Sequence, residues 1–216
     1  MIQLKDFSGK TILGLYEKER EDLQDYLCEV SASYRVLHND FISDYALLEG
    51  VIRFIIENGF FYTIEEILDS LGWFFSYSLL SDLRLIREMS IRISKPEILD
   101  SGTVPSVANK FPCAYLPLIN NMQLHQSSKA GTIFKIIQMN TEDIINLGHY
   151  SKDRALILEG DLLWGEQLFK AGDCVFTREK KSELMQVPKG KSCVLLQINF
   201  NEAQAGFSSH PKEQYF

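Results

Sequence analysis

The chain has 216 residues, of which 45% are hydrophobic and 24% charged, an ordinary globular composition with enough apolar residues for a buried core. The formal net charge of -7 repels phosphate backbones, so the bulk charge argues against nonspecific nucleic-acid binding. The first residues lack the pattern of a secretory signal, and no apolar segment approaches the ~20 residues of a membrane span. We therefore expect a cytoplasmic protein with its scattered cysteines reduced and mostly buried.

Apolar residues in the first part of the chain recur at helical spacing. The spacing predicts an acidic amphipathic helix from Ile12 to Tyr34, with Leu23, Tyr26, Leu27 and Val30 on its apolar side. Three further helices are predicted from Phe41 to Ile55, from Thr63 to Gly72 and from Ser78 to Ile91. Thr63 and Glu66 form a capping-box pattern at the start of the third. These elements predict a helical N-terminal domain over residues 1–95.

Residues 63–91 also allow a DNA-binding helix-turn-helix, with Arg84 and Arg87 exposed on the second helix. The stretch between the helices is long and aromatic, which suits packing better than groove entry. The prospective face also carries Asp82 and Glu88, and the whole chain is acidic. DNA binding is therefore kept only as an alternative.

Prolines, a glycine and serines interrupt the periodicity after Ser94, which predicts a linker over residues 96–111. Short strand patterns then follow to residue 200, and residues 201–216 form a tail. The predicted strands are Cys113–Ile119, Met122–Gln126, Thr132–Met139, Asp143–Tyr150, Ala155–Glu159, Leu162–Trp164, Gln167–Phe169, Cys174–Thr177, Leu184–Val187 and Ser192–Phe200. Overall the sequence predicts an α+β chain, with the helical unit followed by an antiparallel β-barrel over residues 112–200.

The clearest local signal lies between Asn146 and Gly172. Gly165 and Glu166 join two strand patterns as a two-residue hairpin loop, with glycine where a type II′ turn needs it. The run LEGDLLWGEQLFKAGD resembles the core of the cupin family, whose first motif is G(X)5HXH(X)3,4E(X)6G. His149 takes the second histidine position of that motif, Asp153 the glutamate position and Gly160 the last glycine, while Gly172 opens the second motif. The resemblance implies a jelly-roll barrel.

Several motif positions differ from the cupin pattern. Leu147 stands in the first histidine position, Arg178 where a proline is expected, and Glu183 near the position of the last histidine. The resemblance therefore implies a degenerate metal motif. Iron, manganese, zinc or nickel would be held by His149, Asp153 and Glu183, with His125 as a further nitrogen ligand.

The layout is similar to the ChrR-like branch of cupins, in which a helical unit precedes one cupin domain. This similarity implies a bacterial small-molecule-binding regulator or scaffold, with a helical domain that contacts a protein and with a homodimeric assembly. The residues expected to bind the small molecule are Leu147, His149, Tyr150, Trp164 and Phe176. The alternative is a metal-dependent dioxygenase, isomerase or lyase that uses the same metal ligands.

Overall fold

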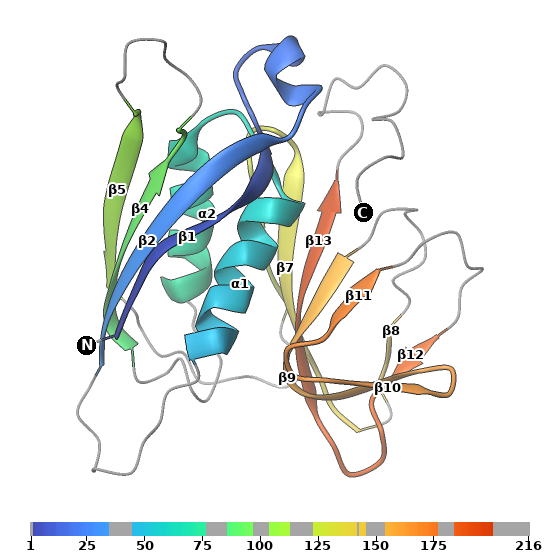
Figure 1. Cartoon of the computed structure of the whole chain (residues 1–216). Helices are drawn as coiled ribbons and strands as arrows, with labels where there is room; N and C mark the ends of the chain where they lie inside the picture. The colour runs from blue at the N-terminus through green and yellow to red at the C-terminus, as the bar shows by residue number, and fades with distance from the viewer. Residues whose placement is uncertain are drawn as a thin grey trace.

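The computed structural model describes residues 2–34, 45–76, 86–96, 104–112, 123–141, 143–145, 154–176 and 184–200. It contains two β-sheets with two α-helices packed between them (Figure 1). In the first half the elements are β1 (Ile2–Leu13), the 3-10 helix η1 (Glu17–Arg20), β2 (Gln24–Tyr34), α1 (Tyr45–Asn58), β3 (Phe60–Phe61), α2 (Ile64–Ser76), β4 (Ile86–Ser94) and β5 (Ser106–Pro112). The second half contains β6 (Gln123–Ser127), β7 (Thr132–Met139), β8 (Ile144–Ile145), β9 (Arg154–Trp164), β10 (Gln167–Lys170), β11 (Cys174–Phe176), β12 (Met185–Gln186) and β13 (Cys193–Phe200).

The first sheet has the strand order β3-β1-β2-β4-β5. All of its pairs are antiparallel except the short parallel pair of β1 and β3. One face is apolar because alternate side chains of each strand point toward the helices. On β2 these residues are Tyr26, Cys28, Val30 and Ala32, each buried.

The predicted helical N-terminal domain is wrong, because the chain begins with two long paired strands. The stretch expected to be a helix from Ile12 to Tyr34 forms the end of β1, η1 and β2. Tyr26 and Val30 are four residues apart, a spacing that fits one helix face and also one strand face. Cys28 and Ala32 lie between them on the same buried side, so the true period is two.

The fourth predicted helix is also wrong where the structure describes it. Residues 86–94 form β4, and Met89, Ile91 and Ile93 are buried at alternate positions. Arg87 therefore lies on a strand, and the proposed recognition helix of the DNA-binding alternative is not formed over residues 86–91. Arg84 lies outside the described residues.

The second and third predicted helices are confirmed as α1 and α2 within the described residues. The capping box is confirmed in modified form: Thr63 Oγ1 accepts the Glu66 N–H at 3.3 Å, and Glu66 Oε2 accepts the N–H of Tyr62 at 2.8 Å. Both helices are buried between the sheets rather than forming a separate unit.

Strand β5 lies almost entirely inside the stretch predicted to be a linker, which ends one residue before Pro112. It pairs with β4 in register from Ser94 opposite Ser106 to Glu88 opposite Pro112, so it completes the first sheet. The backbone N–H of Lys95 donates to the carbonyl of Pro105 at 3.1 Å and extends this pairing past the end of β4.

The second sheet contains most of the predicted strands, although Ala155–Glu159 and Leu162–Trp164 form the single strand β9 rather than two. Its path is β6-β7-β13-β9-β12-β8, with β10 and β11 also paired to β9. Gln167 pairs with Trp164 across Gly165 and Glu166, and Gly165 has a φ of 59°, so the two-residue hairpin is confirmed. Strand β9 pairs with β13 and β11 along its first part and with β10 and β12 along its second, which curls the sheet into a partial barrel. The predicted strand Cys113–Ile119 lies outside the described residues.

One core connects the two sheets through the helices. It contains Phe134, Leu156 and Leu196 of the second sheet together with buried residues of α1, α2 and the first sheet. Thr132 Oγ1 accepts the N–H of Phe60 at 2.7 Å, and Arg154 donates to Asn58 at the end of α1. The halves of the chain are therefore packed as one body.

None of the described helices is long and apolar enough to cross a membrane.

Candidate functional site

A buried lysine lies at the end of β4. Lys95 follows β4, where Met89, Ile91 and Ile93 occupy the inward positions, and it continues their alternation by one step. Its exposed fraction is 5%. Lysine is almost never this buried without a partner or a function.

The partner of Lys95 is Glu19 on η1. Lys95 Nζ lies 3.9 Å from Glu19 Oε1, which is within ion-pair range and too long for a direct hydrogen bond. Burial lowers the pKa of Lys95 below its usual value, and the attraction of Glu19 opposes this shift only in part. Lys95 therefore gives up its proton more readily than a surface lysine.

The loop between β1 and β2 holds Glu19 in place. Its second carboxylate oxygen, Oε2, accepts the N–H of Tyr16 at 3.1 Å, and its backbone carbonyl accepts Nε2 of Gln24 at 2.7 Å. Gly14 lies directly against it, since a Cβ at this position would collide with the Glu19 side chain. The carboxylate is thus positioned by backbone contacts as well as by its charge.

Arg20 connects the same loop to the start of α2. Its Nη1 donates to the carbonyls of Gly14 and Leu15, each at 2.8 Å, and its guanidinium lies 4.9 Å from the ring centre of Tyr62. Leu15 and Tyr16 are exposed by 65% and 72%, large values for apolar and aromatic side chains. The loop that supplies Glu19 to the ion pair therefore also carries an apolar and aromatic surface.

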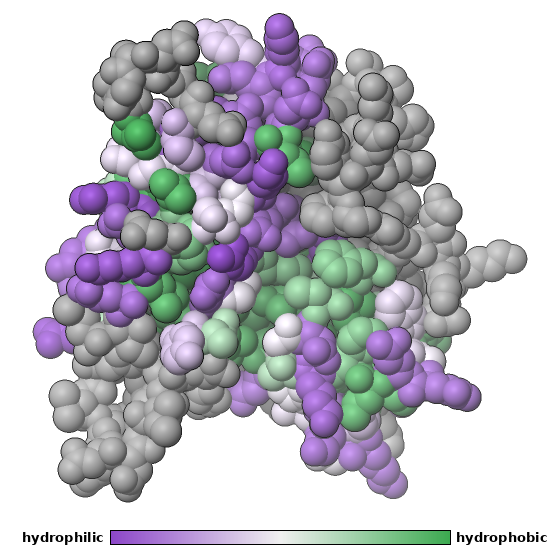
Figure 2. Space-filling view, in the orientation of Figure 1, coloured by the Kyte–Doolittle hydropathy of each residue, from purple (hydrophilic) through white to green (hydrophobic). Residues whose placement is uncertain are grey.

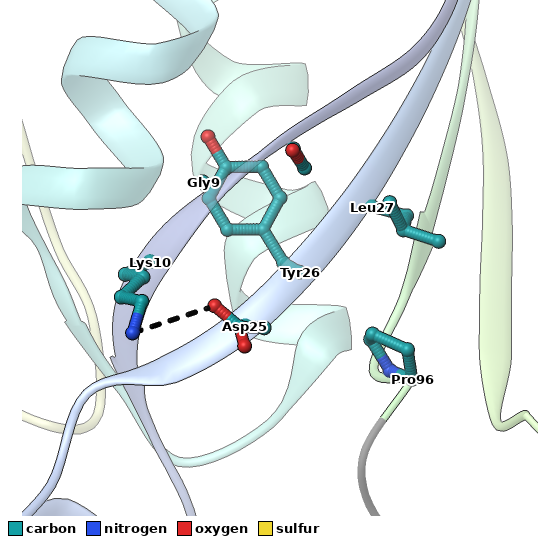
Figure 3. A pocket seen from close by; sticks show the side chains of 7 residues that line it. Gly9, Lys10, Asp25, Tyr26, Leu27 and Pro96 are labelled. Carbon is teal, nitrogen blue, oxygen red and sulfur yellow. Dashed lines mark ion pairs between the residues drawn. The ribbon is translucent and has the colours of Figure 1, made fainter.

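The first sheet also carries a groove, and Pro96, the residue after Lys95, is part of its lining (Figure 3). Its volume is about 440 Å³, and Ser8, Gly9, Lys10, Asp25, Tyr26, Leu27 and Pro96 line it. Lys10 and Asp25 form an exposed ion pair of 3.8 Å at its edge. The Tyr26 hydroxyl donates to Glu57 of α1 at 2.9 Å, and burial raises its pKa well above the usual value. Tyr26 is thus a structural contact between sheet and helix.

Most of the site residues expected from the cupin resemblance cannot be placed. Leu147, His149, Tyr150, Asp153 and Glu183 lie outside the described residues. The backbone of His125 lies in β6, in register with Lys135 of β7. In the parts of the chain that the structure describes, no three His, Cys, Asp or Glu side chains come close enough to hold a metal ion. The metal site therefore stays a prediction.

Trp164 and Phe176 are described, and the structure does not bring them together. Phe176 pairs with Arg154 at one end of β9 and is 45% exposed, while Trp164 ends the same strand. The Trp164 ring centre lies 6.2 Å from that of Phe169, and its buried Nε1 has no hydrogen-bond partner.

The inner face of the partial barrel is apolar where β7, β9 and β13 meet. We call its buried residues the inner cluster: Ile137, Met139, Ala155, Ile157, Leu162, Val175, Met185, Val187, Cys193 and Leu195. Figure 2 shows hydrophobic side chains gathered on the visible face over this sheet, with hydrophilic side chains around them. Burial raises the pKa of Cys193 to about 12, so this thiol is protonated at neutral pH.

No protein-family model matches the chain, and no curated protein matches it. Among solved structures, it is similar to a putative dihydroneopterin aldolase (FolB) from Vibrio cholerae, with 15% identity, a TM-score of 0.45, and coverage of 51% of this chain and 95% of that one. A cupin 2 conserved barrel domain protein from Salinispora arenicola has 14% identity and a TM-score of 0.32, over 39% of this chain and 81% of that one.

The complex of SigE with the anti-sigma ChrR from Rhodobacter sphaeroides is also similar, with 18% identity and a TM-score of 0.33 over 36% of this chain and 42% of that one. All three scores lie below 0.5, so the activities named in these descriptions remain those of the other proteins.

Proposed function

We propose that the chain binds a small ring-shaped molecule beside Lys95 and that the pair of Lys95 and Glu19 transfers a proton to or from it. The observation that carries the proposal is that Lys95 is only 5% exposed and that its ammonium lies 3.9 Å from the Glu19 carboxylate. A buried lysine with a lowered pKa is suited to act as a general base once it has lost its proton.

The surroundings of the pair support a ring as the ligand. Tyr16 and Leu15 are exposed on the loop that holds Glu19, so they offer an aromatic and an apolar surface to a planar molecule. Glu19 would hold the protonated amine after the transfer, because opposite charges at this distance stabilise each other. Proton removal next to a carbonyl or imine is the reaction class that fits these two groups.

The test compares binding and turnover in wild type, Lys95→Met and Glu19→Gln. Dihydroneopterin, the compound in the name of the Vibrio cholerae neighbour, is a suitable first probe because its fused ring carries both donors and acceptors. Thermal-shift screening of pteridines, purines and pyrimidines extends the search. The control is Lys110→Met, since Lys110 forms a 2.7 Å pair with Glu88 on the same sheet but is exposed.

The proposal predicts a ring compound that stabilises wild type and Lys110→Met and is turned over by both. In Lys95→Met we expect turnover to fall by about 100-fold or more, as for loss of a general base. Equal responses of wild type and Lys95→Met to every compound of the screen would overturn it.

A second candidate function is the small-molecule-binding regulator or scaffold that the cupin resemblance implies. The buried Nε1 of Trp164, which has no hydrogen-bond partner, favours it, since a ligand acceptor would satisfy this donor beside an apolar surface. Trp73 is the other tryptophan of the chain, so Trp73→Phe leaves Trp164 as the sole indole reporter. A ligand of this face would change its fluorescence, and the additional change Trp164→Phe would weaken binding.

The metal-dependent alternative rests on His149, Asp153, Glu183 and His125 and has its own test. Elemental analysis of the purified chain and of His149→Ala would show near-stoichiometric metal in the first and a loss in the second. Absence of metal from both preparations would remove this alternative. The homodimer implied by the resemblance is tested by the mass of the chain in solution.

A further inference from the structure

A second polar feature lies on the inner face of the partial barrel, at the end away from Trp164. Lys135 of β7 is directly opposite Gln197 of β13, and Ile133 is opposite Asn199. Paired residues of antiparallel strands point to the same side of a sheet. Ile137 of β7 and Leu195 of β13 belong to the inner cluster. Lys135 lies two residues before Ile137, and Gln197 and Asn199 lie two and four residues after Leu195, so all three share that face.

Asn199 is an unusual residue for such a position. Its exposed fraction is 6%, and its Oδ1 is buried without a hydrogen-bond partner. Buried amide oxygens almost always have a partner, and an orphan of this kind is often completed by a water or a ligand. Its neighbours Ile198 and Leu196 are buried on the opposite face of β13, in the core between sheets and helices.

Lys135 supplies the charge beside this amide. It is half-buried, and none of the acids that the structure describes forms an ion pair with it. Asn199 is its diagonal neighbour across the strand pair, about 7–8 Å away, a gap that one small ligand can bridge. Beyond this polar end the same face continues as the apolar residues Ile137, Leu195 and Ile157.

We propose that Lys135 and Asn199 bind an apolar-chain 2-hydroxy acid at this end of the partial barrel. The carboxylate would pair with Lys135 Nζ, and the hydroxyl would donate to Asn199 Oδ1. Gln197, opposite Lys135, lies next to the carboxylate, and the chain of the acid extends toward the apolar residues. This site stands apart from Lys95 and Glu19, and its test does not involve their chemistry.

The experiment measures calorimetric affinities of the full chain for three matched compounds. 2-Hydroxyoctanoate carries both polar groups, octanoate lacks the hydroxyl, and 1,2-octanediol lacks the charge. The variants are Lys135→Met and Asn199→Leu, with Lys129→Met as control, because Lys129 is an exposed lysine in the turn before β7. Circular dichroism confirms that each variant is folded, and Lys135→Gln replaces Lys135→Met if the latter is not.

For wild type and Lys129→Met we expect 2-hydroxyoctanoate to bind most tightly. Lys135→Met should weaken both acids by about tenfold or more and leave the diol unchanged. Asn199→Leu should remove the preference for 2-hydroxyoctanoate over octanoate. Equal affinities of wild type and Lys135→Met for the acids, or failure of wild type to bind 2-hydroxyoctanoate at millimolar concentration, would overturn the proposal.

Discussion

Lys95 and Glu19 meet at 3.9 Å between the end of β4 and η1, and the lysine is buried while its partner is partly exposed. Lys110 and Glu88 form a shorter pair of 2.7 Å on the same sheet, yet both are exposed. Water and salt screen an exposed pair, which contributes about 0–1 kcal/mol. In the longer pair, burial lowers the pKa of the Lys95 side chain.

The first prediction concerns stability against pH. Because the folded-state pKa of Lys95 is lowered from 10.5, the unfolded chain binds more protons between that lowered pKa and 10.5. The contribution of Lys95 to the free energy of unfolding therefore rises with pH through this window and is flat below it. Lys95→Met lacks this rise and should be no less stable than wild type at pH 7, because it removes a buried ammonium while Glu19 stays in contact with water.

Urea unfolding of wild type, Lys95→Met and Lys110→Met at pH 7 to 10 checks this prediction. Only the difference between wild type and Lys95→Met should shrink as the pH rises. A difference that stays constant over the range would show that Lys95 titrates as an ordinary lysine.

The second prediction concerns Gly14, which lies against Glu19. In Gly14→Ala the new methyl group displaces the Glu19 side chain, which should lower the pKa of Lys95 further and cost about 1–3 kcal/mol of stability. Gly50→Ala in α1 is the control, since a Cβ there meets nothing within 4 Å. It should stabilise the chain by about 0.5–1 kcal/mol through helix propensity. An unchanged Lys95 pKa in Gly14→Ala would contradict the proposed role of this contact.

The third prediction compares two of the three glycines of the cupin-like run, Gly160 and Gly172. Gly160 has a φ of 83°, and a Cβ on it would collide with the backbone of Ser192. Gly172 has a φ of 93° with open space around it. Gly160→Ala should therefore cost about 3 kcal/mol or more, and Gly172→Ala about 1 kcal/mol from backbone strain alone. Thermal unfolding measures both, and equal costs would contradict the close approach at Gly160.

The fourth prediction concerns the junction of the two halves. Thr132 Oγ1 accepts the Phe60 N–H at 2.7 Å and donates to the Phe60 carbonyl at 3.0 Å. Thr132→Val removes both bonds without changing the shape of the side chain and should cost about 1–3 kcal/mol. Thr141→Val is the control, since Thr141 donates to Lys191 at an exposed position. Denaturant unfolding measures the free energy of unfolding of both variants. Equal decreases in Thr132→Val and Thr141→Val would contradict a larger contribution of the junction hydrogen bonds.

The second sheet could be predicted from the sequence because its strands are short and separated by clear turns. The pattern from Thr132 to Met139 coincides with β7, and Gly165 and Glu166 form the predicted hairpin loop. The first sheet could not, because Tyr26, Val30 and Tyr34 satisfy helical and strand spacing at once. Its pairing with residues more than fifty positions away, such as Ser33 opposite Glu88, gives no local signal.

The candidate site was missed for a related reason. The sequence pattern places Glu19 on the acidic face of a predicted helix, and it places Lys95 at the end of the predicted helical domain, just before the predicted linker. Once residues 86–94 are assigned to a strand, Met89, Ile91, Ile93 and Lys95 form one series of alternate, buried positions. A lysine at the last position of such a series is the feature of the sequence that could have indicated the site. Of the residues predicted to bind a ligand, Trp164 and Phe176 are described: Trp164 is the last residue of β9, and Phe176 of β11 pairs with Arg154, the first residue of β9.

The most direct measurement is the pKa of Lys95 itself. Selective carbon-13 labelling of lysine side chains, with Lys95→Met to identify the signal, follows its titration by NMR in the whole chain. The account predicts a pKa below the usual 10.5, and a pKa that falls further in Glu19→Gln, because the favourable charge is then removed. A pKa at or above 10.5 that does not respond to Glu19→Gln would contradict the account and leave the pair an ordinary structural contact.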